Sequence, residues 1–167
     1  MNLWFYSLSE LNFEELMSVY AEGNSLNGAR RYPDESAMMQ KHLAEQDFAD
    51  YLRQTFFRQE GAAYCVLAEN NSYISAARIE KYEDGYLLSA LETRQDMRRK
   101  GYGKRLMDCL LCDCTENGHL PLYSHVDSKN VPSMNLHLQS GFRVKKDYAR
   151  FLDGSVRADS KTLIYEK

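Results

Sequence analysis

A short basic segment with two glycines, residues 98–105 (Arg-Arg-Lys-Gly-Tyr-Gly-Lys-Arg), most limits what this chain can fold into. The apolar run 86–91 before it is typical of a strand, and apolar residues at helical spacing follow it over 106–114. Glycine tolerates positive φ and lets the backbone approach a ligand. A helix N-terminus attracts anions through its free N–H groups and its dipole. The pattern therefore predicts a phosphate-binding loop.

The charge of this segment is local. Five of its eight residues are cationic, whereas the whole chain of 167 residues has a net charge of −3. A nucleic-acid partner would require a broad basic face. A confined positive charge instead favours a small polyanionic ligand, so we expect no nucleic-acid partner.

Length and composition favour one domain, 1–167, with a single core, because 44% of the residues are hydrophobic. The N-terminus lacks the features of a secretion signal. The longest apolar run, 62–68, is far shorter than the about 20 residues needed to cross a bilayer. We therefore expect a cytoplasmic protein with no membrane partner. Three of the four cysteines lie together at 109, 112 and 114, but no second Cys/His pair matches them, so we expect reduced thiols and no metal.

The N-terminal part is predicted to be mainly helical. Residues 3–8 resemble a strand. Asn12 is a typical N-cap, with Glu15 placed as in a capping box, and the helix that follows should end at Gly23. Residues 24–32 have loop composition. A second helical region is expected over 33–57, with a bend or break at 44–47, because its apolar face changes there.

The rest of the chain alternates strands and helices. Strands are expected over 63–69, 73–81 and 86–91, joined by tight turns into an antiparallel meander. A helix from about Gly101 to Asn117, a strand over 122–126, a short helix over 132–139 and strands over 142–150 and 161–165 follow. The fold class is α+β (mixed α/β): a central, mixed, mostly antiparallel sheet of about seven strands with helices on both faces.

A second motif lies about 30 residues after the loop: Asn130-Val-Pro-Ser133-Met-Asn-Leu-His137-Leu-Gln-Ser-Gly-Phe. Together with the pattern Arg98-x-x-Gly101-x-Gly103, it resembles the GNAT superfamily of acyl-CoA-dependent N-acetyltransferases. The resemblance covers about 63–167. It implies a GNAT-like sheet splayed between strands four and five, with acetyl-CoA as the acyl donor. The implied activity is transfer of acetyl to a primary amine of a small molecule or an amino acid.

The resemblance also implies roles for individual residues. Backbone amides of the loop would surround the CoA pyrophosphate, the strand end at 91–93 would pair with the pantetheine arm, and one N–H there would polarise the thioester carbonyl. Asn130 would reach the same arm. The implied cofactor-binding residues are Leu91, Thr93, Arg98, Arg99, Gly101, Tyr102, Gly103, Lys104, Asn130 and Ser133.

Two residues are candidates for proton transfer. The family commonly places a tyrosine acid where this chain has His137, and histidine can also donate a proton. The alternative for His137 is a histidine packed beside the core. Glu92 is the candidate base, with an exposed carboxylate paired to Arg94 as its alternative. Asn130 has an alternative as well, that of a plain helix cap.

The acceptor is less constrained. His125 and Asp127 share a face of the predicted strand 122–126 and either line the acceptor site or lie exposed at its end. Residues 130–137 resemble the branch of the family that acetylates small amino acids. A protein or peptide acceptor and a non-catalytic acyl-CoA-binding module stay open. A nucleotide-binding loop does not fit, since Gly-Lys-Ser/Thr is absent. We expect a monomer or a homodimer.

Overall fold

The structure is a computed structural model that describes residues 2–166. Seven strands form one sheet in the order β1-β2-β3-β4-β5-β9-β6, and β7 and β8 form a separate hairpin. The strands are β1 (Asn2–Phe5), β2 (Ala63–Glu69), β3 (Ser72–Tyr82), β4 (Gly85–Thr93), β5 (Leu122–Asp127), β6 (Arg143–Lys146), β7 (Ala149–Arg150), β8 (Val156–Arg157) and β9 (Ser160–Tyr165). The helices are α1 (Phe13–Val19), α2 (Ala21–Arg31), α3 (Ala37–Gln54), η1 (Phe56–Arg58), η2 (Gln95–Met97), α4 (Tyr102–Glu116) and α5 (Val131–Gln139).

Neighbouring strands of the sheet are antiparallel except β4 and β5, which run parallel. These two strands pair through only three residue pairs, of which Leu88 with Ser124 is the last. β4 continues to Thr93 and β5 to Asp127 without further pairing to each other. The mixed, mostly antiparallel sheet that splays between its fourth and fifth strands is therefore confirmed.

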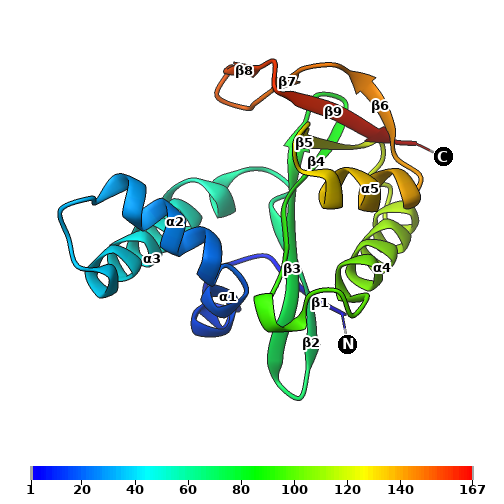
Figure 1. The fold of residues 1–167 in the computed structure, drawn as a ribbon. Coiled ribbons are helices and arrows are strands. Elements are labelled where there is room, and N and C mark those ends of the chain that lie inside the picture. Colours follow the sequence, from blue (N-terminus) through cyan, green and yellow to red (C-terminus); the bar gives the residue numbers. More distant parts are fainter. Residues whose placement is uncertain (1, 167) are drawn as a thin grey trace.

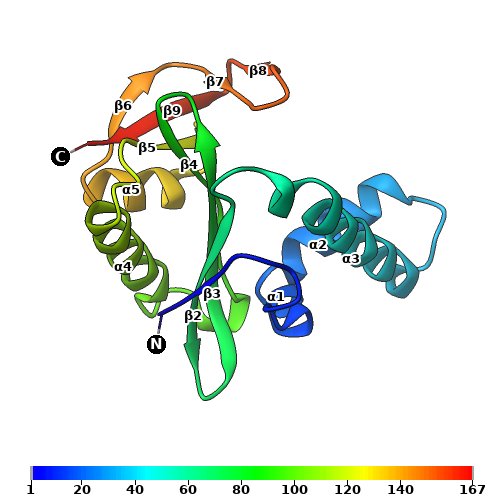
Figure 2. The ribbon, with the colours of Figure 1, turned by 180° about the vertical axis from the view of Figure 1, so that it is seen from behind.

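Helices cover both faces of the sheet (Figures 1 and 2). On one face lie α4 and α5, and the apolar side of α4 that helical spacing predicts is buried against Cys65, Ile79 and Leu163. On the other face lie α1 to α3, whose Leu16 and Leu52 pack in a second cluster. A strand that is covered on both sides carries apolar side chains on both of its faces, as β2 does over residues 63–68.

The N-terminal helices differ from the sequence-based prediction. Asn12 is the N-cap of α1, as predicted, and its Oδ1 accepts a hydrogen bond from the Glu15 N–H at 3.2 Å. The expected loop over 24–32 is wrong, because these residues form α2, and Gly23 lies inside that helix instead of ending it. Gly28 explains the difference. A Cβ there would lie 2.4 Å from the carbonyl oxygen of Gln40, so α2 approaches α3 closely. Packing overrides low helix propensity here.

Three further boundaries differ. α3 is one continuous helix over Ala37–Gln54, so the expected bend at 44–47 is wrong, and the break falls at Thr55. The first strand, expected over 3–8, ends at Phe5. The strand expected over 142–150 is divided into β6, which joins the main sheet, and β7, which pairs with β8. The turn at Asp153-Gly154 thus belongs to the small β7–β8 hairpin.

The close contact at Gly28 predicts a large effect of one methyl group. We expect Gly28→Ala to lower the free energy of unfolding by about 1–3 kcal/mol, because the methyl group overlaps backbone that cannot rotate away. Gly23→Ala is the matched control. No atom lies within 4 Å of a Cβ at Gly23, so alanine should raise stability by about 0.5–1 kcal/mol. Urea denaturation of both variants measures this, and equal effects would contradict the packing argument.

Candidate active site

The basic loop ends where α4 begins. Gly101 is the N-cap of this helix and has φ +84°, a left-handed conformation that favours glycine. Gly103, in the first turn, lies against two other elements. A Cβ at Gly103 would be 3.3 Å from Thr93 Oγ1 in β4 and 3.7 Å from Leu136 Cδ2 in α5. The loop, the end of β4 and α5, which the sequence assigns to cofactor binding, therefore meet at Gly103.

Most of the cationic side chains around the loop have acidic partners. Arg98 Nη2 lies 2.7 Å from Glu92 Oε1 and 2.6 Å from Glu22 Oε2, and Arg98 Nε donates to the Thr93 carbonyl at 3.1 Å. Lys104 forms an ion pair with Asp108 one turn along α4. Arg99 is exposed and has φ +62°. Because Arg98 and Lys104 are engaged within the chain, the exposed side of the loop offers an anion mainly backbone N–H groups, Arg99 and Lys100.

Further along α4, Arg105 also has an acidic partner. Its Nη1 lies 2.8 Å from Glu69 Oε1, and Tyr102 Oη donates to the same carboxylate at 3.0 Å. These bonds lower the pKa of Glu69, with the hydrogen bond from Tyr102 as the largest cause, and they attach the first turn of α4 to the end of β2.

β4 contains a bulge beside the splay. Ala76 of β3 pairs with Glu92 of β4, and Arg78, two residues later, pairs with Ser89. Two steps along β3 therefore match three steps along β4, so β4 carries one extra residue. Ala90 lies in this segment with φ +51°, and the Tyr20 hydroxyl donates to its carbonyl oxygen at 2.7 Å. A bulge interrupts the ladder and turns backbone groups away from the neighbouring strand. The bulge immediately precedes residues 91–93, which are predicted to pair with the pantetheine arm.

Glu92 does not pair with Arg94, the partner expected if it were a simple exposed carboxylate. It binds Arg98, whereas Arg94 binds Asp96, with Nη2 to Oδ2 at 2.8 Å. Burial raises the pKa of Glu92, and the neighbouring Arg98 opposes this shift. Glu92 is thus a half-buried carboxylate beside the bulge, in contact with a fixed guanidinium.

α5 brings the second motif to the same region. Asn130 is its N-cap, and Asn130 Oδ1 accepts from the Ser133 N–H at 3.2 Å. His137 is only 2% exposed and its ring lies 5.0 Å from that of Phe142. Its Nδ1 lies 2.8 Å from the carbonyl oxygen of Ser133, and Nε2 is buried with no hydrogen-bond partner in the described part of the chain. Burial lowers the pKa of His137, so the neutral ring, with its proton on Nδ1, is favoured.

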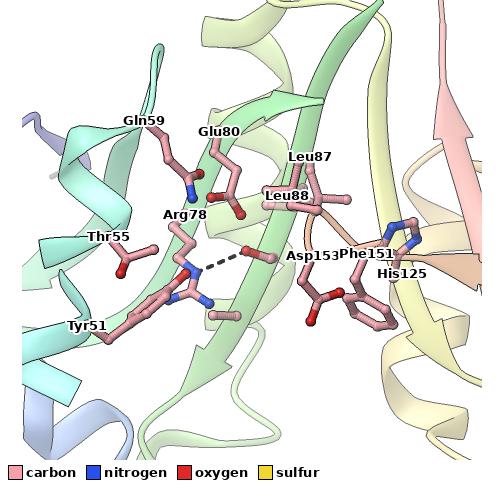
Figure 3. A pocket seen from close by; sticks show the side chains of 13 residues that line it. Tyr51, Thr55, Gln59, Arg78, Glu80, Leu87, Leu88, His125, Phe151 and Asp153 are labelled. Atoms are coloured by element: carbon pink, nitrogen blue, oxygen red, sulfur yellow. Dashed lines mark hydrogen bonds between the residues drawn. The ribbon is translucent and has the colours of Figure 1, made fainter. Parts of the chain in front are cut away.

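A pocket of about 580 Å³ lies on the face of the sheet that α1 to α3 cover (Figure 3). β3 and β4 line it together with α3, β5 and residues 151–153. His125 lines this pocket, whereas Asp127 is exposed at the end of β5 and accepts from the Lys129 N–H at 2.8 Å. The two residues were predicted to share a strand face, but only His125 lines the pocket, whereas Asp127 is exposed to solvent.

Two charged residues of the pocket, Arg78 and Glu80, were not among the predicted site residues. A signal for them exists in the sequence, since both interrupt the apolar strand 73–81 at positions two apart and so share a face. Glu80 is 4% exposed, and burial raises its pKa while Arg78 opposes the shift. Burial also lowers the pKa of His125, with the Arg150 carbonyl opposing.

Across residues 2–166, no group of three His, Cys, Asp or Glu side chains is placed to hold a metal ion. All four cysteines are free thiols, and burial raises the pKa of Cys114 to about 12. Within the same residues, no helix has the length and apolar character to cross a membrane.

Comparisons with known proteins agree with this geometry. Residues 27–142 match the model of the acetyltransferase (GNAT) family. No curated protein matches the chain by sequence. Among solved structures, the chain is similar to a PaiA N-acetyltransferase from Thermoplasma acidophilum in complex with coenzyme A, with a TM-score of 0.68, 13% identity, and coverage of 100% of this chain and 99% of that one.

Two other solved structures are similar. An IAA acetyltransferase from Bacillus cereus matches with a TM-score of 0.65 and 15% identity, over 100% of this chain and 99% of that one. The ribosomal-protein-S18-alanine N-acetyltransferase from Escherichia coli matches with a TM-score of 0.61 and 20% identity, over 98% and 92% of the two chains. At these identities the likeness establishes the fold.

The hydrogen bond from Tyr20 to the bulge is expected to stabilise β4 beside the splay. Tyr20→Phe leaves the Ala90 carbonyl without its side-chain donor, and we expect the free energy of unfolding to fall by about 1–3 kcal/mol. Tyr6→Phe is the control, since Tyr6 is 63% exposed and its change should stay within about 0.5 kcal/mol. Chemical denaturation compares the two, and a neutral Tyr20→Phe would contradict a structural role for this bond.

Proposed function

The chain belongs to the GNAT family of acetyltransferases, and from that premise we propose that it transfers the acetyl group of acetyl-CoA to a primary amine of a small molecule or an amino acid. One observation carries the proposal. β4 contributes both to the loop region, through Thr93 beside Gly103, and to the pocket on the opposite face, through Leu88–Ala90. A cofactor held at the loop and an acceptor held in the pocket would share this strand.

The residues around the loop suit coenzyme A chemically. The N-terminus of α4, a helix of 15 residues, carries free N–H groups and a positive dipole end that stabilise a pyrophosphate. We propose that the amides of residues 98–104 bind that group, with charge from Arg99. The bulged end of β4, including Leu91 and Thr93, with Asn130 and Ser133 at the start of α5, would bind the pantetheine arm. When bound, acetyl-CoA supplies an acetyl group activated as a thioester.

The chain's own residues would then act by positioning and proton transfer. An amine attacks only when it is neutral, so its ammonium must first lose a proton. Glu92 is the sequence-based candidate for accepting it, and its raised pKa makes it a better base than an exposed carboxylate. His137 is the sequence-based candidate for protonating the departing thiolate. A backbone N–H at the bulge would polarise the carbonyl that is attacked.

Acetyl transfer is tested by measuring thiol release from acetyl-CoA with a panel of amines, amino acids and peptides. We expect turnover with at least one small amine or amino acid, and loss of both CoA binding and turnover in Gly103→Trp, because the indole fills the space between Thr93 and Leu136. Gly23→Trp is the control, as a Cβ there meets no atom within 4 Å.

Each outcome of this experiment has a definite meaning. Unchanged CoA affinity in Gly103→Trp, measured by calorimetry, would contradict the loop as the pyrophosphate site. Tight CoA binding without turnover of any acceptor would favour a non-catalytic, acyl-CoA-binding regulatory module. Turnover restricted to peptides would favour a protein or peptide N-acetyltransferase.

The proposed role of His137 as the acid predicts a specific pH dependence. A lowered pKa means that the ring is protonated only below its usual value of 6.5, so kcat should fall as pH rises through that lowered pKa. His137→Phe should remove this dependence and lower kcat by about 10²-fold, with little change in CoA affinity. The exposed His42→Gln serves as the control. A kcat that does not change across this range, or equal losses of kcat and CoA affinity, would leave His137 with a packing role.

A further inference from the structure

The pocket beneath α3 holds two buried charges of opposite sign on one strand face. Arg78 and Glu80 are two residues apart in β3, and both side chains line the cavity (Figure 3). Among residues 2–166, Arg78 Nη1 and Glu80 Oε2 each find no hydrogen-bond partner although both atoms are buried. In the part of the chain that the structure describes, neither side chain takes part in an ion pair.

Arg78 is held in place by neutral contacts. Its Nε donates to Ser89 Oγ at 3.0 Å, and its guanidinium lies 5.0 Å from the ring centre of Tyr51 and 5.3 Å from that of Phe56. Aromatic faces stabilise a cation without neutralising it. A fixed, planar guanidinium with free hydrogen-bonding capacity is a typical binding group for a carboxylate.

Glu80 presents the opposite charge at the same site. Glu80 is almost fully buried, and its side chain is drawn in the cavity beside Arg78 (Figure 3). Burial disfavours a charge, and the neighbouring Arg78 offsets this only in part for Glu80, whose pKa stays raised. A ligand of opposite charge would therefore stabilise each group further. The complementary group for Glu80 is an ammonium.

Asp153 also lines the pocket, but it is exposed and its Oδ1 already accepts from the Ser155 N–H at 2.8 Å. The two buried charges, Arg78 and Glu80, therefore select among classes of amine. A diamine would bring a second cation toward Arg78, and a dicarboxylate would bring a second anion toward Glu80, so each would meet repulsion. A zwitterion satisfies both residues. Leu87, Leu88, Phe151 and Leu152 form apolar walls around them, which suit an apolar side chain. Ala90, in the β4 bulge, lines the same cavity and so adjoins the proposed reaction centre.

We propose that the acceptor is an amino acid with an apolar side chain, whose carboxylate binds Arg78 and whose ammonium binds Glu80. This inference rests on the proposed acetyl transfer, and it assigns the substrate class of that site. Arg78 and Glu80 are then specificity-determining residues: Arg78 recognises the carboxylate, and Glu80 recognises the ammonium as the substrate binds.

The test compares each of leucine, methionine and phenylalanine with its carboxamide and with the amine that lacks the carboxyl group. We expect kcat/KM for the best free amino acid to exceed that of its two analogues by about tenfold or more. The amine of a carboxamide is the weaker base and is neutral to a greater extent. A preference for the free acid therefore reflects recognition of the carboxylate and not the reactivity of the amine.

Variants separate the two recognition steps. Arg78→Gln should reduce the preference for the acid over the amide to within about threefold, because it removes the group that binds the carboxylate. Glu80→Gln should lower kcat/KM for acid and amide by the same factor, because both carry the ammonium. Arg53→Gln removes an equal charge from an exposed position on α3. It should change neither the preference for the acid over the amide nor kcat/KM for either substrate. Thermal melting of each variant checks folding, and the wild-type preference tests the inference even where a variant unfolds.

Calorimetry on the protein saturated with CoA distinguishes this inference from the proposed function. If no acceptor releases thiol but a free amino acid binds more tightly than its amide, and Arg78→Gln removes that difference, the ligand class stands and acetyl transfer fails. If amines without a carboxylate are acetylated as well as the free acids, acetyl transfer stands and the inference is overturned. Failure of all three amino acids both to react and to bind also overturns it.

Discussion

The early end of hydrogen bonding between β4 and β5 is the constraint on which the rest of the structure depends. Beyond Leu88 and Ser124 the two strands continue without pairing to each other, in the middle of a seven-stranded sheet. Backbone N–H and C=O groups that lose their ladder partners need others. The bulge at Ala90 begins at this point, and its carbonyl is bound by Tyr20 from the helical layer. The hydrogen bond from Tyr20 thus stabilises the strands where they separate. The basic loop follows the end of β4, and the pocket lies on one face of the sheet.

The cationic side chains of the basic loop fall into two groups: some form ion pairs within the chain, and others face outward. Arg98 and Arg105 bind carboxylates of α2, β4 and β2, so they join the loop to the elements around it. Exposed pairs of this kind contribute little stability each, but they orient the segment. What the loop presents outward is its backbone at the start of α4, together with Arg99 and Lys100. If backbone amides bind the pyrophosphate as proposed, the glycines at 101 and 103 matter more than the number of cations.

The helical layer of α1 to α3 lies on the side of the sheet where the acceptor is proposed to bind. It covers β2 and β3 with Leu16 and Leu52, and it supplies the rings of Tyr51 and Phe56 on which the guanidinium of Arg78 rests. Variation in α3 would change the pocket and leave α4 untouched, since α4 lies on the other face of the sheet (Figure 2). The loop does contact the helical layer, because Arg98 binds Glu22 of α2. The loop region and the pocket therefore share β4, and Glu22 and Tyr20 also connect the helical layer to the loop and to the bulge.

Sequence by itself determined the features that arise within a few residues: the cap at Asn12, the buried stripe of α4, the glycine-bearing turn before it, and the order of strands from β2 to β5. It also determined the family, through two motifs with local spacing. Tertiary structure alone decided the rest. Residues 24–32 are helical because Gly28 meets Gln40 of another helix, Arg98 binds Glu22 and Glu92 from two other elements, and Arg78 and Glu80 share a pocket with His125. These contacts join residues far apart in the chain, and local propensity carries no information about such distances.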